Sequence, residues 1–397
     1  MTAEFPPLYL KRREDRRIRA GHPWVFSNEI NIERSPLTAF EAGAPVVIHS
    51  HANQVLGTGY VNPGSLICAR ILVHGKASAL DEEWLDTRIG HALALRGRLY
   101  SHDQYRLVYG ESDGLPGLVV DRYDDVLVVQ TATAGMERMR TQVVESLCRL
   151  VKPRVVILRN DGAGRSLEGL DSYVDVVVGE SPETVEVEEG SARFQVSPLT
   201  GQKTGWYYDH RPNRARMLAY VPERRVLDVF SYCGAWGVQA AVAGADSVVC
   251  VDSSEVFLQQ ATENAERNGV ASTVSVQRGD AFAVLKELHS AGERFGVVVL
   301  DPPAFIRRKK DLRNGIEAYR RINRLACQLL EPDGILISAS CSYHLSRDEL
   351  LRVVQHGTRA TGRTGQVLEE GHQGPDHPVL PVLPESGYLK AFFVRVS

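Results

Sequence analysis

The sequence lacks the cysteine patterns that stabilise disulfide-rich domains or hold structural zinc. Its six cysteines, at positions 68, 148, 233, 250, 327 and 341, include no Cys-x-x-Cys pair and no accompanying histidine spacing. We therefore expect neither a disulfide framework nor a bound metal ion. Also missing are an apolar run of about 18 residues, as in a membrane span, and the apolar core of a secretory signal. We expect a soluble, cytoplasmic protein without a membrane partner.

The overall charge gives no indication of a nucleic-acid partner. The formal net charge is −3, so any basic surface must be a local one. The hydrophobic fraction of 43% and the charged fraction of 24% are close to those of ordinary globular proteins. At 397 residues the chain is long enough for two or three domains.

The pattern along the chain predicts three domains. Residues 1–75 alternate short strand-like runs with turns, which is typical of a small β-rich module. Residues 76–183 contain strands around a predicted helix at 136–151 and indicate an α+β domain. From residue 184 to 397, strands alternate with helices of about 10 to 20 residues. This part predicts an α/β fold with a doubly wound, mostly parallel sheet, whose strands we expect at 225–229, 247–251, 273–277, 297–300 and 334–338.

A cofactor loop is predicted directly after the first of these strands. A dinucleotide needs the pyrophosphate cradle Gly-x-Gly-x-x-Gly, whereas this loop has only Gly234-x-x-Gly237 behind the acidic Asp228. A carboxylate repels pyrophosphate but suits the ammonium and sulfonium groups of S-adenosylmethionine. Asp252, at the end of the next strand, can hold both ribose hydroxyls. The alternative is a glycine-containing turn without a ligand.

Further cofactor contacts are expected at the ends of the other strands and in one upstream segment. Asp280 can accept a hydrogen bond from the adenine amine, although an aspartate after a strand is as often a helix N-cap. The segment from 202 to 214 combines aromatic, cationic and acidic residues that can cover a cofactor or stack a base; a capped helix start is the alternative. The remaining predicted cofactor contacts are Asp209, Arg211, Phe230, Ser231, Gly234 and Asp301. Within the segment from 202 to 214, Lys203 and Tyr207 are predicted to contact RNA.

Cys341 and Asp301 are the predicted catalytic residues. Cytosine C5 attacks a methyl group only after a thiolate has added to C6, and a carboxylic acid at N3 favours that addition by neutralising the developing negative charge. Cys341 lies in a polar Ser-Cys-Ser loop after a predicted strand, and Asp301 ends the neighbouring strand. A buried, inert thiol is the alternative for Cys341. Cys233 is the rival thiol and is expected to be structural, as is His344.

A basic stretch follows Asp301. Residues 307–324 contain eight basic residues against two acids. The run Arg307, Arg308, Lys309 and Lys310, together with Pro302 and Pro303, is predicted to contact RNA. The alternative is a merely solvated helix face.

Several motifs together resemble the bacterial 23S ribosomal RNA large-subunit methyltransferase I family of cytosine-C5 enzymes. They cover nearly the whole chain and are Gly21–Ser27, Glu111–Leu118, Gln202–Arg211, Asp228–Tyr232, Asp301–Phe305 and Ser340–Ser342. The resemblance implies an N-terminal RNA-binding PUA domain, a central α+β domain and a Rossmann-like methyltransferase domain. It further implies S-adenosylmethionine as cofactor, S-adenosylhomocysteine as product, and 23S ribosomal RNA or a large-subunit assembly intermediate as partner.

The sequence departs from related cytosine-C5 enzymes at one catalytic position. Many of them carry Pro-Cys after this strand, whereas here Pro303 is followed by Ala304. The second cysteine that assists enzyme release is therefore absent, and the base that removes the C5 proton is not identified. Two alternative functions stay open, which are methylation of an exocyclic base amine and a noncatalytic role as an RNA-binding ribosome-assembly factor. A homodimer is also left open.

Overall fold

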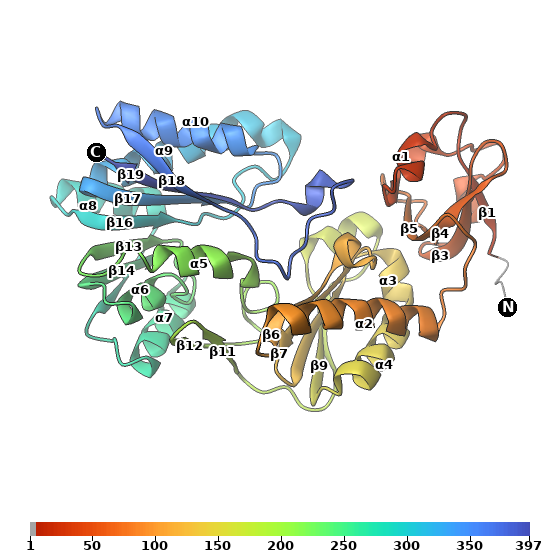
Figure 1. The fold of residues 1–397 in the computed structure, drawn as a ribbon, viewed down its shortest axis with the longest axis horizontal. Helices are drawn as coiled ribbons and strands as arrows, with labels where there is room; N and C mark the ends of the chain where they lie inside the picture. Colours follow the sequence, from red (N-terminus) through yellow and green to blue (C-terminus); the bar gives the residue numbers. More distant parts are fainter. Residues whose placement is uncertain (1–4) are drawn as a thin grey trace. The chain divides into compact units, whose positions relative to one another are not determined.

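The computed structural model describes residues 5–397, which form two units that share the chain in alternating segments. One unit contains residues 5–185, 197–206 and 375–386, and the other contains 186–196, 207–374 and 387–397. Figure 1 shows the ribbon coloured along the sequence. Each unit therefore depends on segments that lie far apart in the chain.

The first unit begins with a five-stranded sheet in the order β1-β3-β4-β5-β2. Strand β1 runs parallel to β3, and the other pairs are antiparallel. Apolar side chains from these strands and from α1 form one buried cluster, which gives this part a core of its own. The elements are β1 (Pro7–Tyr9), α1 (Arg16–Arg19), β2 (Trp24–Val25), β3 (Ala44–His49), β4 (Val55–Val61) and β5 (Ala69–His74).

A second sheet of the same unit has the order β10-β9-β8-β7-β6. The helix predicted at 136–151 is divided, because the backbone leaves the helical region at Met139 between α3 and α4. Helices α2 and α4 pack against each other, and their apolar faces join the core of this sheet. The elements are α2 (Glu82–Leu99), β6 (Gln104–Tyr109), β7 (Leu118–Tyr123), β8 (Val126–Thr131), α3 (Ala134–Arg138), α4 (Arg140–Val151), β9 (Val155–Asn160) and β10 (Tyr173–Val178).

A buried glutamate connects the two sheets of this unit. Glu168 accepts hydrogen bonds from the Asn62 amide at 2.7 Å, the Ser65 hydroxyl at 3.1 Å and the Arg70 guanidinium at 2.9 Å. A buried carboxylate is tolerated where it is paired and hydrogen-bonded in this way. The first sheet is therefore fixed to the segment that follows β9.

The second unit is built on a seven-stranded sheet in the order β15-β14-β13-β16-β17-β19-β18. The first five strands are parallel, whereas β19 is antiparallel to both of its neighbours. The strands are β13 (Arg225–Val229), β14 (Ser247–Asp252), β15 (Val274–Arg278), β16 (Phe295–Leu300), β17 (Leu330–Ser340), β18 (Gly365–Gly371) and β19 (Lys390–Val396). The five parallel strands overlap those predicted from the sequence.

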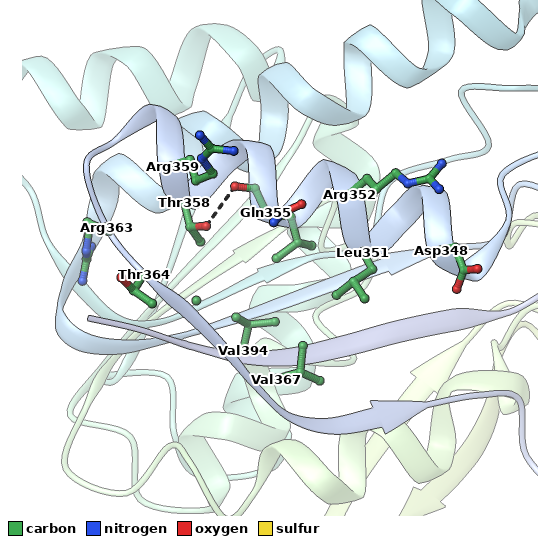
Figure 2. Close-up of a pocket in the computed structure, with 12 residues that line it drawn as sticks. Asp348, Leu351, Arg352, Gln355, Thr358, Arg359, Arg363, Thr364, Val367 and Val394 are labelled. Atoms are coloured by element: carbon green, nitrogen blue, oxygen red, sulfur yellow. Dashed lines mark hydrogen bonds between the residues drawn. The ribbon is translucent and has the colours of Figure 1, made fainter.

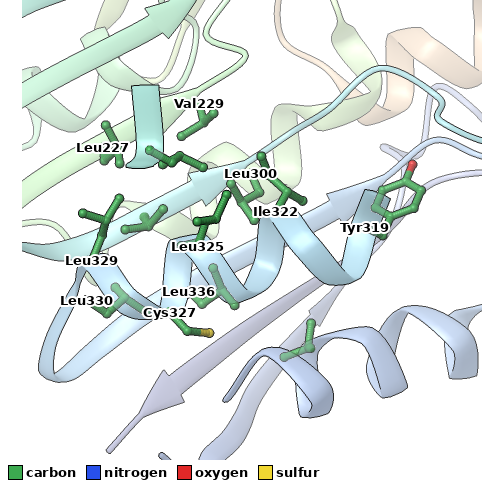
Figure 3. Close-up of a cluster of buried hydrophobic side chains, with 14 of the residues drawn as sticks. Leu227, Val229, Leu300, Tyr319, Ile322, Leu325, Cys327, Leu329, Leu330 and Leu336 are labelled. Carbon is green, nitrogen blue, oxygen red and sulfur yellow. The ribbon is translucent and has the colours of Figure 1, made fainter. Parts of the chain in front are cut away.

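Successive side chains of a strand point to opposite faces of the sheet, so neighbouring residues of these strands belong to different cores. Leu227, Val229 and Leu300 belong to the cluster that also contains residues of α8, α9 and α10, part of which is drawn in Figure 3. Val226 and Val297 belong to the cluster that contains residues of α5, α6 and α7. The sheet is therefore covered on both faces by α5 (Arg211–Met217), α6 (Gly237–Val242), α7 (Glu255–Arg267), α8 (Ala281–Ser290), α9 (Leu312–Leu329) and α10 (Arg347–Ala360). No helix in the described part of the chain is long and apolar enough to cross a membrane.

A buried ion pair fixes a small hairpin to this unit. The hairpin consists of β11 (Val185–Glu189) and β12 (Ala192–Val196). The Arg214 guanidinium donates to both carboxylate oxygens of Glu189, at 2.5 and 2.7 Å, and both side chains are almost fully buried. Burial alone would raise the pKa of Glu189, but Arg214 lowers it below its ordinary value.

Replacing Arg214 by leucine leaves the Glu189 carboxylate buried without its partner. We expect Arg214→Leu to lower the free energy of unfolding by about 3–5 kcal/mol. Urea unfolding together with hydrogen exchange of peptides from β11 and α5 measures the change. The double variant Glu189→Leu with Arg214→Leu should recover most of the loss, because no buried charge remains. Equal stability of the single variant and the wild type would contradict the prediction.

Candidate active site

The carboxyl ends of the parallel strands bring the predicted residues of this unit to one edge of the sheet. Val229 lies opposite Val251 on one side and Leu300 on the other, and Leu300 lies opposite Ser338. Three aspartates therefore lie at the carboxyl ends of adjacent strands: Asp228 near the end of β13, Asp252 at the end of β14 and Asp301 directly after β16. Cys341 directly follows β17. Ligands of open α/β sheets bind at this edge.

The loop after β13 has an unusual backbone. Phe230, Tyr232 and Gly234 have φ angles of 67°, 51° and 81°, in the left-handed region that non-glycine residues seldom adopt. The amides of Phe230 and Ser231 both donate to the Val251 carbonyl, at 2.9 and 3.0 Å, which holds the turn. A Cβ on Gly237 would lie 2.5 Å from the Cys250 sulfur, so that position requires glycine.

Asp228 is a buried carboxylate with an unused acceptor. The Gly237 amide donates to its Oδ2 at 2.9 Å, whereas Oδ1 has no partner among the described residues. Burial raises the pKa of Asp228 to about 7; the Gly237 hydrogen bond opposes this rise, and the charges of Asp301 and Asp252 add to it. A cation beside Oδ1 would relieve this excess of negative charge.

The other residues predicted around this loop differ in how they are held. Asp252 accepts from the amides of Tyr232 at 3.1 Å and Ser254 at 2.9 Å, so its orientation is fixed. Asp280 caps α8 by accepting from the Ala283 amide at 3.0 Å, as in the alternative considered for it, and is exposed. The hydroxyl of Ser231 is buried and has no partner among the described residues.

Asp301 is held between an imidazole and an indole. His210 Nε2 lies 3.2 Å from its Oδ1, and Trp236 Nε1 donates to its Oδ2 at 3.1 Å. Burial favours the neutral acid, but His210 and the two hydrogen bonds more than offset it, so the pKa of Asp301 is lowered. Asp301 is therefore ionised at neutral pH, whereas the sequence-based mechanism expects a carboxylic acid. Trp236 and His210 also stack edge to face, with centroids 5.3 Å apart.

The segment before α5 is held by contacts within the protein. Asp209 is buried and accepts a hydrogen bond from the Tyr388 hydroxyl. The Arg211 guanidinium lies over the Tyr208 ring, 4.8 Å from its centroid. Tyr207 meets Tyr232 edge to face at 5.6 Å, and burial raises its pKa, with smaller effects from Asp209, Asp301 and Cys341. Lys203 is exposed and belongs to the other unit.

The loop that carries Cys341 is fixed through the serines on either side of it. The Tyr319 hydroxyl lies 2.8 Å from the Ser340 hydroxyl and 2.9 Å from that of Ser342. Ser342 also accepts from the Ile306 amide at 3.3 Å, which connects this loop to the segment after Asp301. Cys341 itself is partly exposed. The Ser-Cys-Ser pattern thus holds the loop while Cys341 stays partly exposed.

The remaining predicted residues follow Asp301. Pro302 is buried and Pro303 is exposed. Arg307, Arg308, Lys309 and Lys310 are all exposed and lie just before α9. They form a basic segment next to Asp301 in the sequence. No group of three or more histidine, cysteine, aspartate or glutamate residues in the described part of the chain could hold a metal ion.

A separate groove of about 530 Å³ lies between α10 and strands β18 and β19 (Figure 2). Leu351, Val367 and Val394 supply its apolar lining, and Arg352 and Arg359 lie at its rim on α10. None of the predicted site residues lines it. The predicted site is therefore the strand-end cluster and not this groove.

Sequence reasoning did not identify four residues of the cluster. His210 and Trp236 hold Asp301, Tyr388 holds Asp209, and Lys390 donates to the loop that carries Cys341. His210 and Trp236 lie inside motifs that the sequence singled out. Tyr388 and Lys390 lie in a C-terminal segment with no comparable motif, so only the sheet order could have indicated them.

The burial of the thiols predicts which cysteines react. Cys341 and Cys148 are partly exposed, whereas Cys68, Cys233, Cys250 and Cys327 are buried, and burial raises the pKa of each of those four. We expect iodoacetamide to modify Cys341 and Cys148 in the native protein at least about tenfold faster than the buried four. Peptide mass spectrometry after timed labelling measures this. Modification of Cys233 at the rate of Cys341 would contradict the structural role given to Cys233.

Two family models match the chain. A model described as a PUA-like domain matches residues 8–74, and a model described as an S-adenosylmethionine-dependent methyltransferase matches residues 165–394. The fold class predicted from the sequence is confirmed, and so is S-adenosylmethionine as the cofactor. The domain limits at 75 and 183 stay predictions.

Curated relatives match the chain over nearly its full length. The ribosomal RNA large subunit methyltransferase I of Klebsiella pneumoniae is 36% identical over 397 residues, which is 99% of this chain and 98% of the relative. The protein of the same name from Shewanella denitrificans is 38% identical over 394 residues, 98% of this chain and 99% of the relative.

Solved structures show the same fold. A candidate S-adenosylmethionine-dependent methyltransferase from Streptococcus mutans aligns with a TM-score of 0.83 at 18% identity, covering 98% of this chain and 100% of its own. A candidate methyltransferase in complex with S-adenosylhomocysteine aligns with a TM-score of 0.85 at the same identity and coverage. With its full-length relatives at more than one third identity, this chain belongs to the ribosomal RNA large subunit methyltransferase I family of S-adenosylmethionine-dependent enzymes.

Proposed function

We propose that this protein methylates C5 of a cytosine in 23S ribosomal RNA, with Cys341 as the nucleophile. The observation that carries the proposal is that a partly exposed cysteine and a carboxylate follow the ends of neighbouring strands. Tyr319 fixes the loop of Cys341, and His210 with Trp236 fixes Asp301. The names of the full-length relatives support ribosomal RNA of the large subunit as the substrate.

The residues around β13 fit the cofactor. The unpaired Oδ1 of Asp228 and the buried Ser231 hydroxyl are acceptors that a ligand with cationic and hydrogen-donating groups would satisfy. Asp252 would hold the ribose, Phe230 and Gly234 would line the loop, and Asp280 has an exposed carboxylate for the adenine amine. When bound, S-adenosylmethionine supplies an electrophilic methyl group, and S-adenosylhomocysteine is the product.

The proposed reaction follows from nucleophilic catalysis. The Cys341 thiolate forms a bond to C6, and the electron pair of the C5–C6 double bond moves to make C5 nucleophilic. After C5 has gained the methyl group, a base removes the C5 proton. The C5–C6 double bond then re-forms as the sulfur–C6 bond breaks, and the thiolate is regenerated.

Asp301 has a modified role in this proposal. Because its pKa is lowered, it enters the reaction as a carboxylate and accepts a hydrogen bond from the exocyclic amine of cytosine. His210 and Trp236 orient this carboxylate, through a contact of 3.2 Å and a hydrogen bond of 3.1 Å. A carboxylate fixed in this way can hold the cytosine in position for attack by Cys341.

RNA contacts are proposed for three regions. The PUA-like domain at residues 8–74 would bind structured RNA, and the exposed run Arg307–Lys310 would neutralise phosphates near the target base. Pro302, Pro303 and Tyr207 would border the base itself, and Lys203 would contact the backbone. A base within a helix must be flipped out to reach such a site.

The ionised Asp301 also supports methylation of an exocyclic amine as a second candidate. A carboxylate at this strand end accepts from an amine, and that chemistry requires no thiol. The two candidates differ in their dependence on Cys341 and in the nucleoside produced.

The pKa of Asp228 predicts how cofactor binding depends on pH. A cationic ligand beside Asp228 favours the ionised form, so the affinity for S-adenosylmethionine should fall as pH falls through about 7. The loss should approach about tenfold per pH unit. Calorimetric titration between pH 5.5 and 7.5 measures it. Asp228→Asn should bind more weakly and lose this dependence, and a pH-independent affinity of the wild type would contradict the role.

A methyl-transfer assay separates the two candidate reactions. Labelled S-adenosylmethionine is incubated with 23S RNA from cells that lack the modification, and the labelled nucleoside is identified after digestion. We expect 5-methylcytidine, a loss of at least about a thousandfold in Cys341→Ala, a strong loss in Asp301→Asn, and no loss in the control Cys148→Ala. Label on another nucleoside, or activity that survives Cys341→Ala, would favour the exocyclic amine.

The covalent intermediate has its own test. RNA with fluorine at C5 of cytidine has no proton for the base to remove, so the sulfur–C6 bond should persist. We expect this RNA to stay attached to Cys341 in the wild type and not to become attached to Cys341→Ala. Cofactor binding without any transfer to naked RNA would direct the assay to large-subunit assembly intermediates.

A further inference from the structure

Lys390 lies across the sheet from the residue before Cys341. In the antiparallel pair of β17 and β19, Lys390 is directly opposite Ser340. The chain leaves β17 at the next residue, which is Cys341. The side chain of Lys390 thus enters the region where the Cys341 loop begins.

The ammonium group of Lys390 is bonded to that loop at two points. Nζ donates to the main-chain carbonyl of Ser342 at 2.7 Å and to that of Leu345 at 2.7 Å. These bonds use two of the three donors of the ammonium group. The turn that follows Cys341 is therefore anchored to β19 by a positive charge.

Other titratable groups face Cys341 from separate elements. Tyr319 approaches from α9 and Tyr207 from the segment before α5, and burial raises the pKa of both phenols, with a further contribution from Cys341. Asp301 ends the neighbouring strand, and His344 follows in the same loop. At neutral pH the two phenols are uncharged and the carboxylate disfavours a second negative charge nearby.

The charge state of Lys390 responds to Cys341. Burial lowers the pKa of Lys390 to about 8, and the interaction with Cys341 opposes this shift. The influence is mutual, because a thiolate that favours the ammonium is favoured by it to the same extent. The ammonium form is present below about pH 8 and is lost as the pH rises through that value.

We propose that Lys390 is a positioning residue that keeps Cys341 in its reactive thiolate form and holds the turn after it in place. The inference deepens the proposed function, on which it rests. The same ammonium stabilises the thiolate when the sulfur–C6 bond forms and when it breaks. Lys390 acts through Cys341 and is not assigned a contact with the base.

Alkylation of Cys341 across the pH range tests the role without using RNA. The rate of modification by iodoacetamide is measured between pH 5.5 and 9.5 by peptide mass spectrometry in the wild type and in Lys390→Arg, Lys390→Gln and Lys390→Met. We expect the midpoint for Cys341 to rise by about one pH unit in Lys390→Met and Lys390→Gln. It should stay close to the wild type in Lys390→Arg.

The variants separate the charge of Lys390 from its hydrogen bonds as causes of the effect on Cys341. Glutamine retains a hydrogen-bond donor without the charge, so a wild-type midpoint in Lys390→Gln would overturn the role of the charge. Cys148, which lies in the other unit, is the internal reference, and its profile should be the same in all four proteins. An unchanged midpoint for Cys341 in Lys390→Met, with equal limiting rates at high pH, would overturn the proposal.

Failure of this inference can be distinguished from failure of the proposed function. If the midpoint shifts but no 5-methylcytidine is formed by the wild type, Lys390 activates Cys341 and the assigned reaction fails. If 5-methylcytidine is formed and the midpoint does not shift, the reaction stands and Lys390 has no such role.

Discussion

The parallel order of β13, β14, β16 and β17 determines where charge gathers in this protein. Because these strands run the same way, the residues at their carboxyl ends share one edge of the sheet, and three of those residues are aspartates. Burial raises the pKa of Asp228 to about 7, and the charges of Asp301 and Asp252 add to this rise. His210 and Trp236 lower the pKa of Asp301, and a cofactor with a sulfonium group would bring positive charge to the same edge of the sheet.

The surroundings of Asp228 and Asp301 shift the pKa values of these two residues in opposite directions. Asp228 has one backbone donor and a pKa of about 7, so both its neutral and its ionised forms are present near neutral pH, whereas Asp301 has His210 and Trp236 and is ionised. Two aspartates from adjacent strands thus differ in protonation because of what is packed against them. This division matches one residue suited to a cation and one suited to accepting a hydrogen bond.

The sequence was sufficient for the fold class and for the strand ends. Five parallel strands with acidic or thiol-bearing ends were readable because buried parallel strands are continuous apolar runs. It was not sufficient for the loop after β13, where Phe230 and Tyr232 adopt left-handed φ angles that their residue types do not suggest. The protonation of Asp301 was missed for a related reason, since the imidazole that sets it comes from a separate segment.

Two other features depended on contacts that no local pattern encodes. Lys203 and Tyr207 lie in one motif, yet the division of the chain falls between them. Lys390 became relevant only through the pairing of β17 with β19, which are separated by α10 and β18. Sequence reasoning was least able to identify those residues of the site that have no motif of their own and are brought together only by the order of the strands.

The position of β19 inside the sheet has a consequence for how the protein folds. Strand β18 precedes β19 in the chain, but its neighbour in the sheet is β19, which in turn contacts β17. Completion of this edge therefore needs β19, because β18 is joined to β17 only through it. Such nonlocal pairing makes closure of the edge slow. Until β19 inserts, the loop of Cys341 lacks its anchor, so a completed sheet and a fully anchored nucleophile should appear in the same late folding step.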